Sequence, residues 1–153
     1  MSENALGTNV VCQVAIIVKD IERTSKAWAR LLGVPVPPWR LTDPAEDSHI
    51  RYRGGPTDAR AKLAFFDLGE QVRLELIEPV GRPSTWGDFL DRYGQGIHHI
   101  AFRSKGMDEV LARLEAQGIS LVQRGDYTGG RYAYVDGLEK LGAILELLEN
   151  LDD

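Results

Sequence analysis

The chain carries one pattern twice, and this internal repeat restricts its fold more than any other feature. A strand-like run begins at Gln13 and another at His99, and each leads into a helix-like run that ends at a glycine, Gly33 or Gly118. Each copy later contains a short apolar strand with glutamates, Leu74-Glu75-Leu76-Ile77-Glu78 in the first copy and Leu145-Glu146-Leu147-Leu148-Glu149 in the second. Two ordered copies within 153 residues predict two similar halves that share one core.

Each copy is expected to fold as one strand, one helix and three further strands. In the first copy Asp20 would cap the helix, because its carboxylate can accept the free N–H groups of the first turn, and Gly33 would end it. The expected strands of this copy are residues 11–18, 50–53, 62–67 and 72–78, with a proline-rich loop at 35–44. The expected strands of the second copy are residues 97–103, 121–123, 131–135 and 143–149, with a helix at about 107–114 after the first of them.

We therefore predict an α+β protein in which two tandem βαβββ modules form one curved mixed sheet around a cup. Residues 1–153 form a single domain in this prediction, with module one at about 10–80 and module two at about 96–150. A short amphipathic linker helix at about 84–94 is interpreted as a packing element. Equivalent strands of the two modules would bring equivalent residues together around an approximate two-fold axis.

Four residues at equivalent positions of the two copies predict that the cup binds a metal ion. Side chains alternate along a strand, so Glu75 and Glu146 would face away from their leucine neighbours and into the cup. Two buried carboxylates that face each other repel, and a divalent cation removes that penalty. The expected metal ligands are Gln13, Glu75, His99 and Glu146. This donor set suits Zn, Mn, Co, Ni or Fe and leaves a coordination position for water or substrate.

Three other residues with reactive side chains are given structural roles. His98 precedes His99 on one strand, so the two imidazoles would point to opposite faces and only His99 would line the cup. The same expectation disfavours an iron dioxygenase site with two histidines. His49 lies in or near a loop and is expected at the surface. Cys12 is expected to be a small core residue rather than a ligand or a nucleophile.

Four stretches of the chain resemble the vicinal oxygen chelate superfamily, which includes glyoxalases, bleomycin resistance proteins and extradiol dioxygenases. They are residues 13–22, 74–79, 96–102 and 142–147. The stretches Gly96-Ile97-His98-His99-Ile100-Ala101-Phe102 and Gly142-Ala143-Ile144-Leu145-Glu146-Leu147 are similar in particular to methylmalonyl-CoA epimerases. The resemblance covers nearly the whole chain, so it implies the fold of that superfamily.

The resemblance also implies a ligand for each position of the family site. The first ligand is usually histidine, and Gln13 holds that position here, while Glu75, His99 and Glu146 match the second, third and fourth. This set resembles the zinc-type glyoxalase I, whereas the strand motifs resemble the epimerases. Epimerases use one more glutamate as an acid and base, in the region that corresponds to residues 53–58. Asp58 is the nearest carboxylate in that region.

The implied activity is that of a metal-dependent isomerase or lyase. It would move a proton at a carbon next to a carbonyl or thioester through a metal-stabilised enolate, as methylmalonyl-CoA epimerase does. We expect Glu146 to be the main catalytic base, with Glu75 as the second candidate. The alternatives are a lactoylglutathione lyase-type glyoxalase and a non-catalytic, antibiotic-binding protein of the same fold. The implied partners are a small-molecule substrate, either an acyl-CoA or a 2-oxo compound or its thiol adduct, and a second copy of the chain in a homodimer.

Several basic and aromatic residues are candidates for contact with the substrate. The arginines could bind a phosphate or a carboxylate through their planar guanidinium groups. They are Arg51, Arg53, Arg60, Arg124 and Arg131. Tyr132 and Tyr134 share one face of an expected strand. Surface charge and ordinary packing remain the preferred interpretation of each.

Charge and hydropathy exclude other classes of partner. The 18 basic and 23 acidic residues give a formal net charge of −5, which disfavours nucleic acid and anionic membranes. The sequence contains no run of 18 apolar residues, so no membrane-spanning helix is expected. The start of the chain, Met1-Ser2-Glu3-Asn4, lacks the features of a signal peptide, and the single Cys12 cannot form an internal disulfide. We therefore expect a cytoplasmic location.

Overall fold

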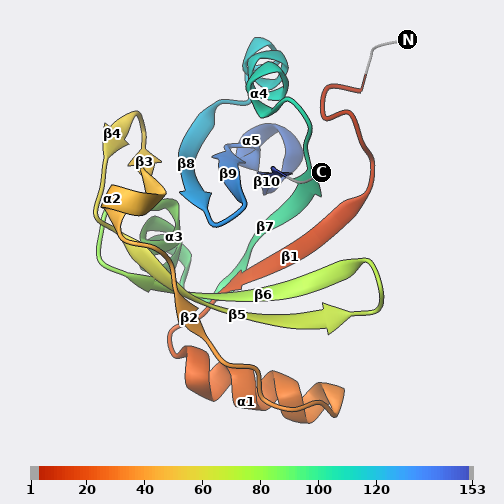
Figure 1. The fold of residues 1–153 in the computed structure, drawn as a ribbon, viewed down its shortest axis with the longest axis vertical. Helices are drawn as coiled ribbons and strands as arrows, with labels where there is room; N and C mark the ends of the chain where they lie inside the picture. The colour runs from red at the N-terminus through yellow and green to blue at the C-terminus, as the bar shows by residue number, and fades with distance from the viewer. Residues whose placement is uncertain (1–3, 152–153) are drawn as a thin grey trace.

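A computed structural model describes residues 4–151 as one curled, mixed sheet of ten strands with five helices around it (Figure 1). The strands are β1 Val11–Ile17, β2 Arg40–Leu41, β3 Arg51–Tyr52, β4 Gly55–Pro56, β5 Arg60–Leu68, β6 Val72–Val80, β7 Gly96–Arg103, β8 Leu121–Tyr127, β9 Gly130–Val135 and β10 Ile144–Asn150. The helices are α1 Ile21–Leu32, α2 Ala45–Ser48, α3 Thr85–Tyr93, α4 Met107–Ala116 and α5 Leu138–Leu141. The predicted α+β fold with a curved mixed sheet is confirmed.

The sheet has an approximate two-fold axis between its two central strands. Its order is β2-β5-β6-β1-β7-β10-β9-β8-β3-β4. Strands β1 and β7 pair antiparallel at the centre, and each has a parallel neighbour, β6 beside β1 and β10 beside β7. Antiparallel β5 and β9 follow on either side. The first half is therefore β2-β5-β6-β1, and the second half is β7-β10-β9-β8.

Helix α1 covers the outer face of the first half. Asp20 caps it, since its side chain accepts a hydrogen bond from the Arg23 N–H, and Gly33 ends it in the left-handed conformation. Its buried residues Ile21 and Ala29 belong to one apolar cluster with the outward-facing leucines of β6. These contacts fix which face of β6 is apolar, and therefore which face is left for the cup.

Helix α4 covers the outer face of the second half in the same way. Its buried residues Met107, Val110 and Leu114 pack in one cluster with Leu145 and Leu147 of β10. Between the halves, Ser84 caps α3 by accepting a hydrogen bond from Gly87 N–H. None of the helices within residues 4–151 is long and apolar enough to cross a membrane.

One predicted strand lies in the other half of the sheet. The sequence assigned residues 50–53 to module one, but Arg51 and Tyr52 of β3 pair with Arg124 and Gln123 of β8. The edge position of the first half is taken instead by β2, within the segment predicted as a loop, which pairs with β5. The prediction was wrong because local pattern identifies a strand but not its partner, and here the chain crosses over between β2 and β5. This crossover brings Ser48, Ile50 and Ala59 to the wall of the cup.

Candidate metal centre

Alternation along β6 and β10 directs one glutamate of each strand into the cup, the concave face of the sheet. The leucines on either side of Glu75 pack on the outer face under α1. The leucines on either side of Glu146 pack on the outer face near α4. Because neighbouring side chains on a strand point to opposite faces, both glutamates point inward, and both are buried.

Gln13 and His99 reach the same place from the two central strands. Gln13 pairs with Ala101 across the two-fold axis, and His99 pairs with Ala15. Each alanine also pairs with one of the two glutamates, on β6 or on β10. The floor between the four polar side chains is therefore built from two fully buried methyl groups. Such small side chains leave room for longer neighbours to converge above them.

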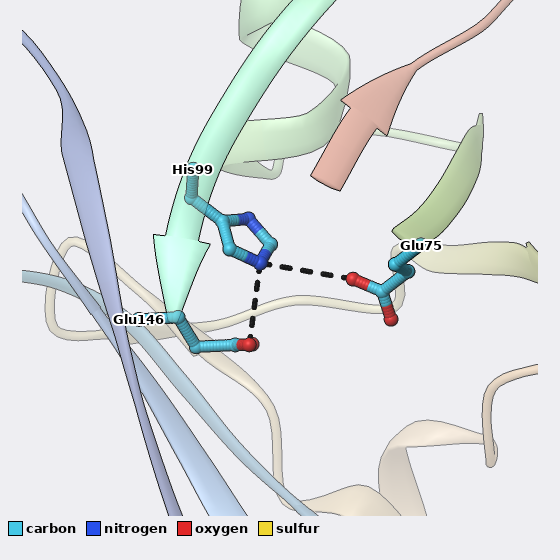
Figure 2. A group of neighbouring side chains, drawn as sticks. All are labelled: Glu75, His99 and Glu146. Carbon is cyan, nitrogen blue, oxygen red and sulfur yellow. Dashed lines mark ion pairs between the residues drawn. The ribbon is translucent and has the colours of Figure 1, made fainter. Parts of the chain in front are cut away.

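The structure brings the four predicted ligand residues into one cluster. The Nε2 atom of His99 lies 3.2 Å from Oε1 of Glu146 and 3.7 Å from Oε1 of Glu75. It lies 3.5 Å from Oε1 of Gln13. Figure 2 shows both carboxylates turned toward this nitrogen from different strands. One potential ligand atom from each of Glu75, His99 and Glu146 lies within 4.8 Å of the others, a spacing that could hold a metal ion.

Burial controls the charges of this cluster. Burial raises the pKa of Glu75 well above its usual value, and the nearby Glu146 raises it further. Burial raises the pKa of Glu146 to about 8 and lowers the pKa of His99 to about 3. Since His99 is then neutral at physiological pH, it offers a lone pair but no positive charge to either carboxylate.

The unpaired oxygen atoms show that the cluster fits a divalent cation. Oε1 of Glu75 and Oε1 of Glu146 are buried and have no hydrogen-bond partner among the described residues. Buried carboxylates without partners are costly unless they are protonated or coordinate a metal. Three oxygen donors and one imidazole nitrogen match the preferences of Mn, Fe, Co, Ni and Zn. The donor set that the sequence predicted therefore suits such an ion chemically.

A buried hydrogen-bond network behind the cluster begins at α3. Trp86 donates from Nε1 to the hydroxyl of Tyr134, at 3.0 Å. The hydrogen bond between Tyr134 and Glu146 lowers the pKa of this carboxyl, against the larger effect of burial. Gln123 accepts from the main chain of Thr85 and donates to the hydroxyl of Tyr132. The linker helix was predicted as a packing element, and its first turn also supports residues of the cup.

The sequence predicted that His98 points away from the cup, and this prediction was wrong. Ala15 pairs with His99, but the next residue of β1, Ile16, pairs with Ile97. His98 is therefore the extra residue of a β-bulge, and a bulge re-aims side chains that a regular strand would send to opposite faces. The centres of the two imidazole rings lie 5.0 Å apart, and a hydrogen bond of 2.7 Å joins Nδ1 of His98 to Nδ1 of His99. Both nitrogens of His98 are occupied, since Nε2 contacts Thr85, so His98 offers no donor to a metal.

The cluster lies at the base of a cavity of about 190 Å³ that opens to solvent. Aromatic side chains form much of its wall, including Phe65, Trp86, Tyr132 and Tyr134. The two tyrosines do lie on one face of β9, as their spacing predicted. A concave apolar pocket with a few convergent polar groups is the usual form of a small-molecule site.

Three arginines that sequence reasoning missed line the cavity, namely Arg40, Arg73 and Arg103. The Arg73 guanidinium lies 4.0 Å from the centre of the Phe65 ring. A signal for two of them was present in the sequence. Arg73 precedes Glu75 by two positions and Arg103 follows His99 by four, so alternation places both on the face of the ligands. Arg40 follows a proline-rich segment, where no periodic pattern could locate it.

The five arginines proposed from the sequence are directed elsewhere. Their partners are Gly54 for Arg51, Tyr52 and Asp88 for Arg53, Thr42 for Arg60, and Asp108 for Arg124 and Arg131, the last of which also pairs with Glu149. Surface and structural contacts were the preferred interpretation of these residues, and the observed partners agree with it.

The remaining candidates lie outside the cluster. His49 is exposed, as predicted, and its Nδ1 lies 2.9 Å from Oδ2 of Asp126. Asp58 is exposed on the chain between β4 and β5. Cys12 is only partly buried, so the prediction of a core residue was wrong in degree, and its thiol donates to the Ala101 carbonyl at 3.4 Å. Cys12 is the extra residue of a second bulge, between Val11 and Gln13, and a bulged side chain packs less completely.

Comparison with protein families supports the superfamily indicated by the motifs. The family model described as Glyoxalase/Bleomycin resistance protein/Dioxygenase superfamily matches residues 12–135. The uncharacterized protein YqjC of Bacillus subtilis (strain 168) is 36% identical over 99 residues, which cover 63% of this chain and 70% of YqjC. The predicted resemblance to this superfamily is thereby confirmed.

Solved structures of methylmalonyl-CoA epimerases share the fold. The enzyme from Mycobacterium tuberculosis is 22% identical with a TM-score of 0.67, over 98% of this chain and 92% of that one. A methylmalonyl-CoA epimerase in complex with methylmalonyl-CoA and NH4+ is 21% identical with a TM-score of 0.64, over 92% and 94% of the two chains. The similarity of the motifs to epimerase-like members is therefore matched by similarity of the fold.

Proposed function

We propose that this chain, which belongs to the glyoxalase/bleomycin resistance protein/dioxygenase superfamily, is a metal-dependent enzyme that moves a proton at a carbon next to a carbonyl or thioester group. One observation carries the proposal. Two buried carboxylates, Glu75 and Glu146, have unpaired oxygen atoms beside a neutral imidazole and an amide oxygen, at the base of an open cavity. Such an arrangement supplies both the ligands for a cation and a group that can accept a proton.

The division of labour among the four residues follows from their chemistry. A divalent cation bound here would stabilise the negative charge that develops on the substrate oxygen as the neighbouring carbon loses its proton. Gln13 and His99, which do not carry charge at neutral pH, would hold the cation. Glu146 would take the proton and return it, because its carboxylate lies in the cluster, beside the place of the cation and the substrate oxygen. Glu75 is the second candidate for this role.

The arginines that line the cavity support an anionic acyl substrate. The chain as a whole carries a net charge of −5, yet outside the metal cluster three arginines, Arg40, Arg73 and Arg103, line this cavity against two aspartates, Asp43 and Asp126. Guanidinium groups favour carboxylates and phosphates as partners. An acyl-CoA or a short 2-oxo acid derivative would place its reacting end at the cluster and its negative charge near the arginines.

Gln13 favours a second candidate, a lyase of the lactoylglutathione type, because the set Gln13, Glu75, His99 and Glu146 resembles the ligands of the zinc-type glyoxalase I. The position of Asp58 also bears on epimerisation, which needs an acid and a base on opposite sides of the carbon. Asp58 is exposed, so Glu75 and Glu146 would have to fill both roles. The two candidates share the abstraction of a proton next to a carbonyl and differ in the substrate.

Exchange of the substrate proton with deuterium tests the proposal directly. The protein would be loaded with Zn, Mn, Co or Ni and incubated in D2O with methylmalonyl-CoA, or with the adduct of methylglyoxal and glutathione. We expect loss of the α-proton signal in NMR spectra for one of these substrates. Glu146→Gln should abolish the exchange, whereas Glu139→Gln on the exposed helix α5 should leave it unchanged.

Two results would contradict the proposal. One is a protein that retains less than about 0.1 metal ion per chain after loading, which would favour a metal-free binding protein of this fold. The other is a fully loaded protein that exchanges no proton in either substrate. Undiminished exchange in the Glu146→Gln variant would transfer the role of base to Glu75.

A further inference from the structure

His98 is buried between the metal cluster and the start of helix α3. Its Nδ1 lies 2.7 Å from Nδ1 of His99, and its Nε2 lies 2.5 Å from Oγ1 of Thr85. Only 2% of His98 is exposed, so both contacts lie in a region of low dielectric constant. The three residues form a chain of hydrogen bonds that leads from the cluster to the first turn of α3.

The direction of this chain depends on which nitrogens carry the protons. The hydrogen bond between Nδ1 of His98 and Nδ1 of His99 needs one donor and one acceptor, so only one of these two nitrogens carries a proton. The hydroxyl of Thr85 can accept a hydrogen bond from Nε2 of His98, and a metal ion at the cluster requires a bare Nε2 on His99. Both conditions are met when Nε2 of His98 carries the proton.

The proton positions of both rings are then determined. A neutral imidazole has one N–H, so Nδ1 of His98 must accept a hydrogen bond. Its partner, Nδ1 of His99, must donate. The free lone pair of His99 consequently lies on Nε2, the atom that faces Glu75, Glu146 and Gln13.

We propose that His98 is a positioning residue that keeps the proton of His99 on Nδ1 and thereby presents the lone pair of Nε2 to a metal ion. This inference rests on the proposed function, because it assigns His98 and Thr85 a purpose at the same site. The opposite arrangement would place an N–H on Nε2, where a proton blocks coordination. A partner that holds the second nitrogen of a ligating histidine typically fixes both the ring and its tautomer. Here the bulge at His98 makes that partner the preceding residue of the same strand.

NMR spectra of the metal-free protein test the proton positions without any reaction. The chain has only 3 histidines, so long-range correlations between ring protons and 15N in a labelled sample can be assigned with His49→Gln and His98→Asn variants. We expect a protonated Nδ1 and a bare Nε2 in His99, and the reverse in His98. A proton on Nε2 of His99 would overturn the inference. This result is decisive even if the wild-type protein binds no metal, an outcome that would overturn the proposed function separately.

Metal affinity tests the consequence. Titration with Co(II), followed by its visible absorption, should show roughly 10- to 100-fold weaker binding in His98→Leu. His98→Asn should recover most of the affinity, because its side-chain oxygen can accept the hydrogen bond from Nδ1 of His99. Thr85→Val should weaken binding and Thr85→Ser should not, while His49→Leu, at an exposed site, serves as the control. Wild-type affinity in a folded His98→Leu protein would refute the positioning role.

Discussion

Above about pH 7, the metal-free protein should become less stable as the pH rises, and Glu146→Gln should remove the contribution of Glu146 to this dependence. Burial raises the pKa of Glu146 from 4.5 to about 8. Between these values the folded state binds more protons than the unfolded state, so the free energy of unfolding falls with increasing pH. The difference of 3.5 pKa units, at about 1.4 kcal/mol per unit, corresponds to roughly 5 kcal/mol. The stabilisation is complete below the unfolded pKa of 4.5 and is lost as the pH passes through 8.

Urea unfolding of protein treated with a chelator measures this effect at about pH 5 and about pH 9. Comparison with Glu146→Gln cancels the contributions of groups that do not interact with Glu146, because glutamine resembles the protonated carboxyl. The two proteins should be of similar stability at the lower pH, and the variant should be more stable by several kcal/mol at the higher pH. Metal-loaded wild type should show the opposite trend, since the cation holds the carboxylates ionised. A constant difference between the two metal-free proteins would refute our account of the buried carboxylates.

Three further predictions concern the floor of the cup, its mouth and a helix cap. Ala101→Val should weaken metal binding at least about tenfold, because it adds two methyl groups under the ligands, while Ala64→Val, buried on the outer face, should change stability but not affinity. Arg73→Gln should raise KM for an anionic acyl substrate by about tenfold with little change in kcat, and Arg30→Gln on α1 should alter neither. Asp20→Ala should lower the free energy of unfolding by about 1 kcal/mol in urea titrations through loss of the α1 cap. The first prediction would be contradicted by equal metal affinities of the two valine variants. The second would be contradicted by an unchanged KM in Arg73→Gln, and the third by an unchanged urea midpoint in Asp20→Ala.

The features that sequence analysis located correctly are those set by local periodicity and by the repeat. Alternation alone turns Glu75 and Glu146 inward once their leucine neighbours are assigned to the outer face. The repeat then pairs Gln13 with His99 as equivalent residues. In the structure these two residues occupy positions that the approximate two-fold axis exchanges, since each pairs with an alanine on the opposite central strand.

The features that sequence analysis missed depend on contacts between distant segments. Nothing local shows that β3 joins β8, because a two-residue strand can pair with any exposed edge. The bulge at His98 was missed for the same reason, since it is defined by the pairing of β7 with β1 rather than by the residues of β7. Arg73 and Arg103 were different, because their spacing from the ligands was sufficient to place them.

The approximate symmetry also explains why the two central strands carry different ligands. Cys12 and His98 are the extra residues of equivalent bulges, each just before a ligand position. Helix α3 lies between the halves in sequence, so its first turn can support only one of the two places, and Thr85 contacts His98. An imidazole needs such support, because its two nitrogens exchange roles between tautomers. An amide oxygen needs none, since it is always an acceptor. A histidine therefore suits the supported position. A glutamine suits the other position, where the preceding residue, Cys12, donates to the Ala101 carbonyl.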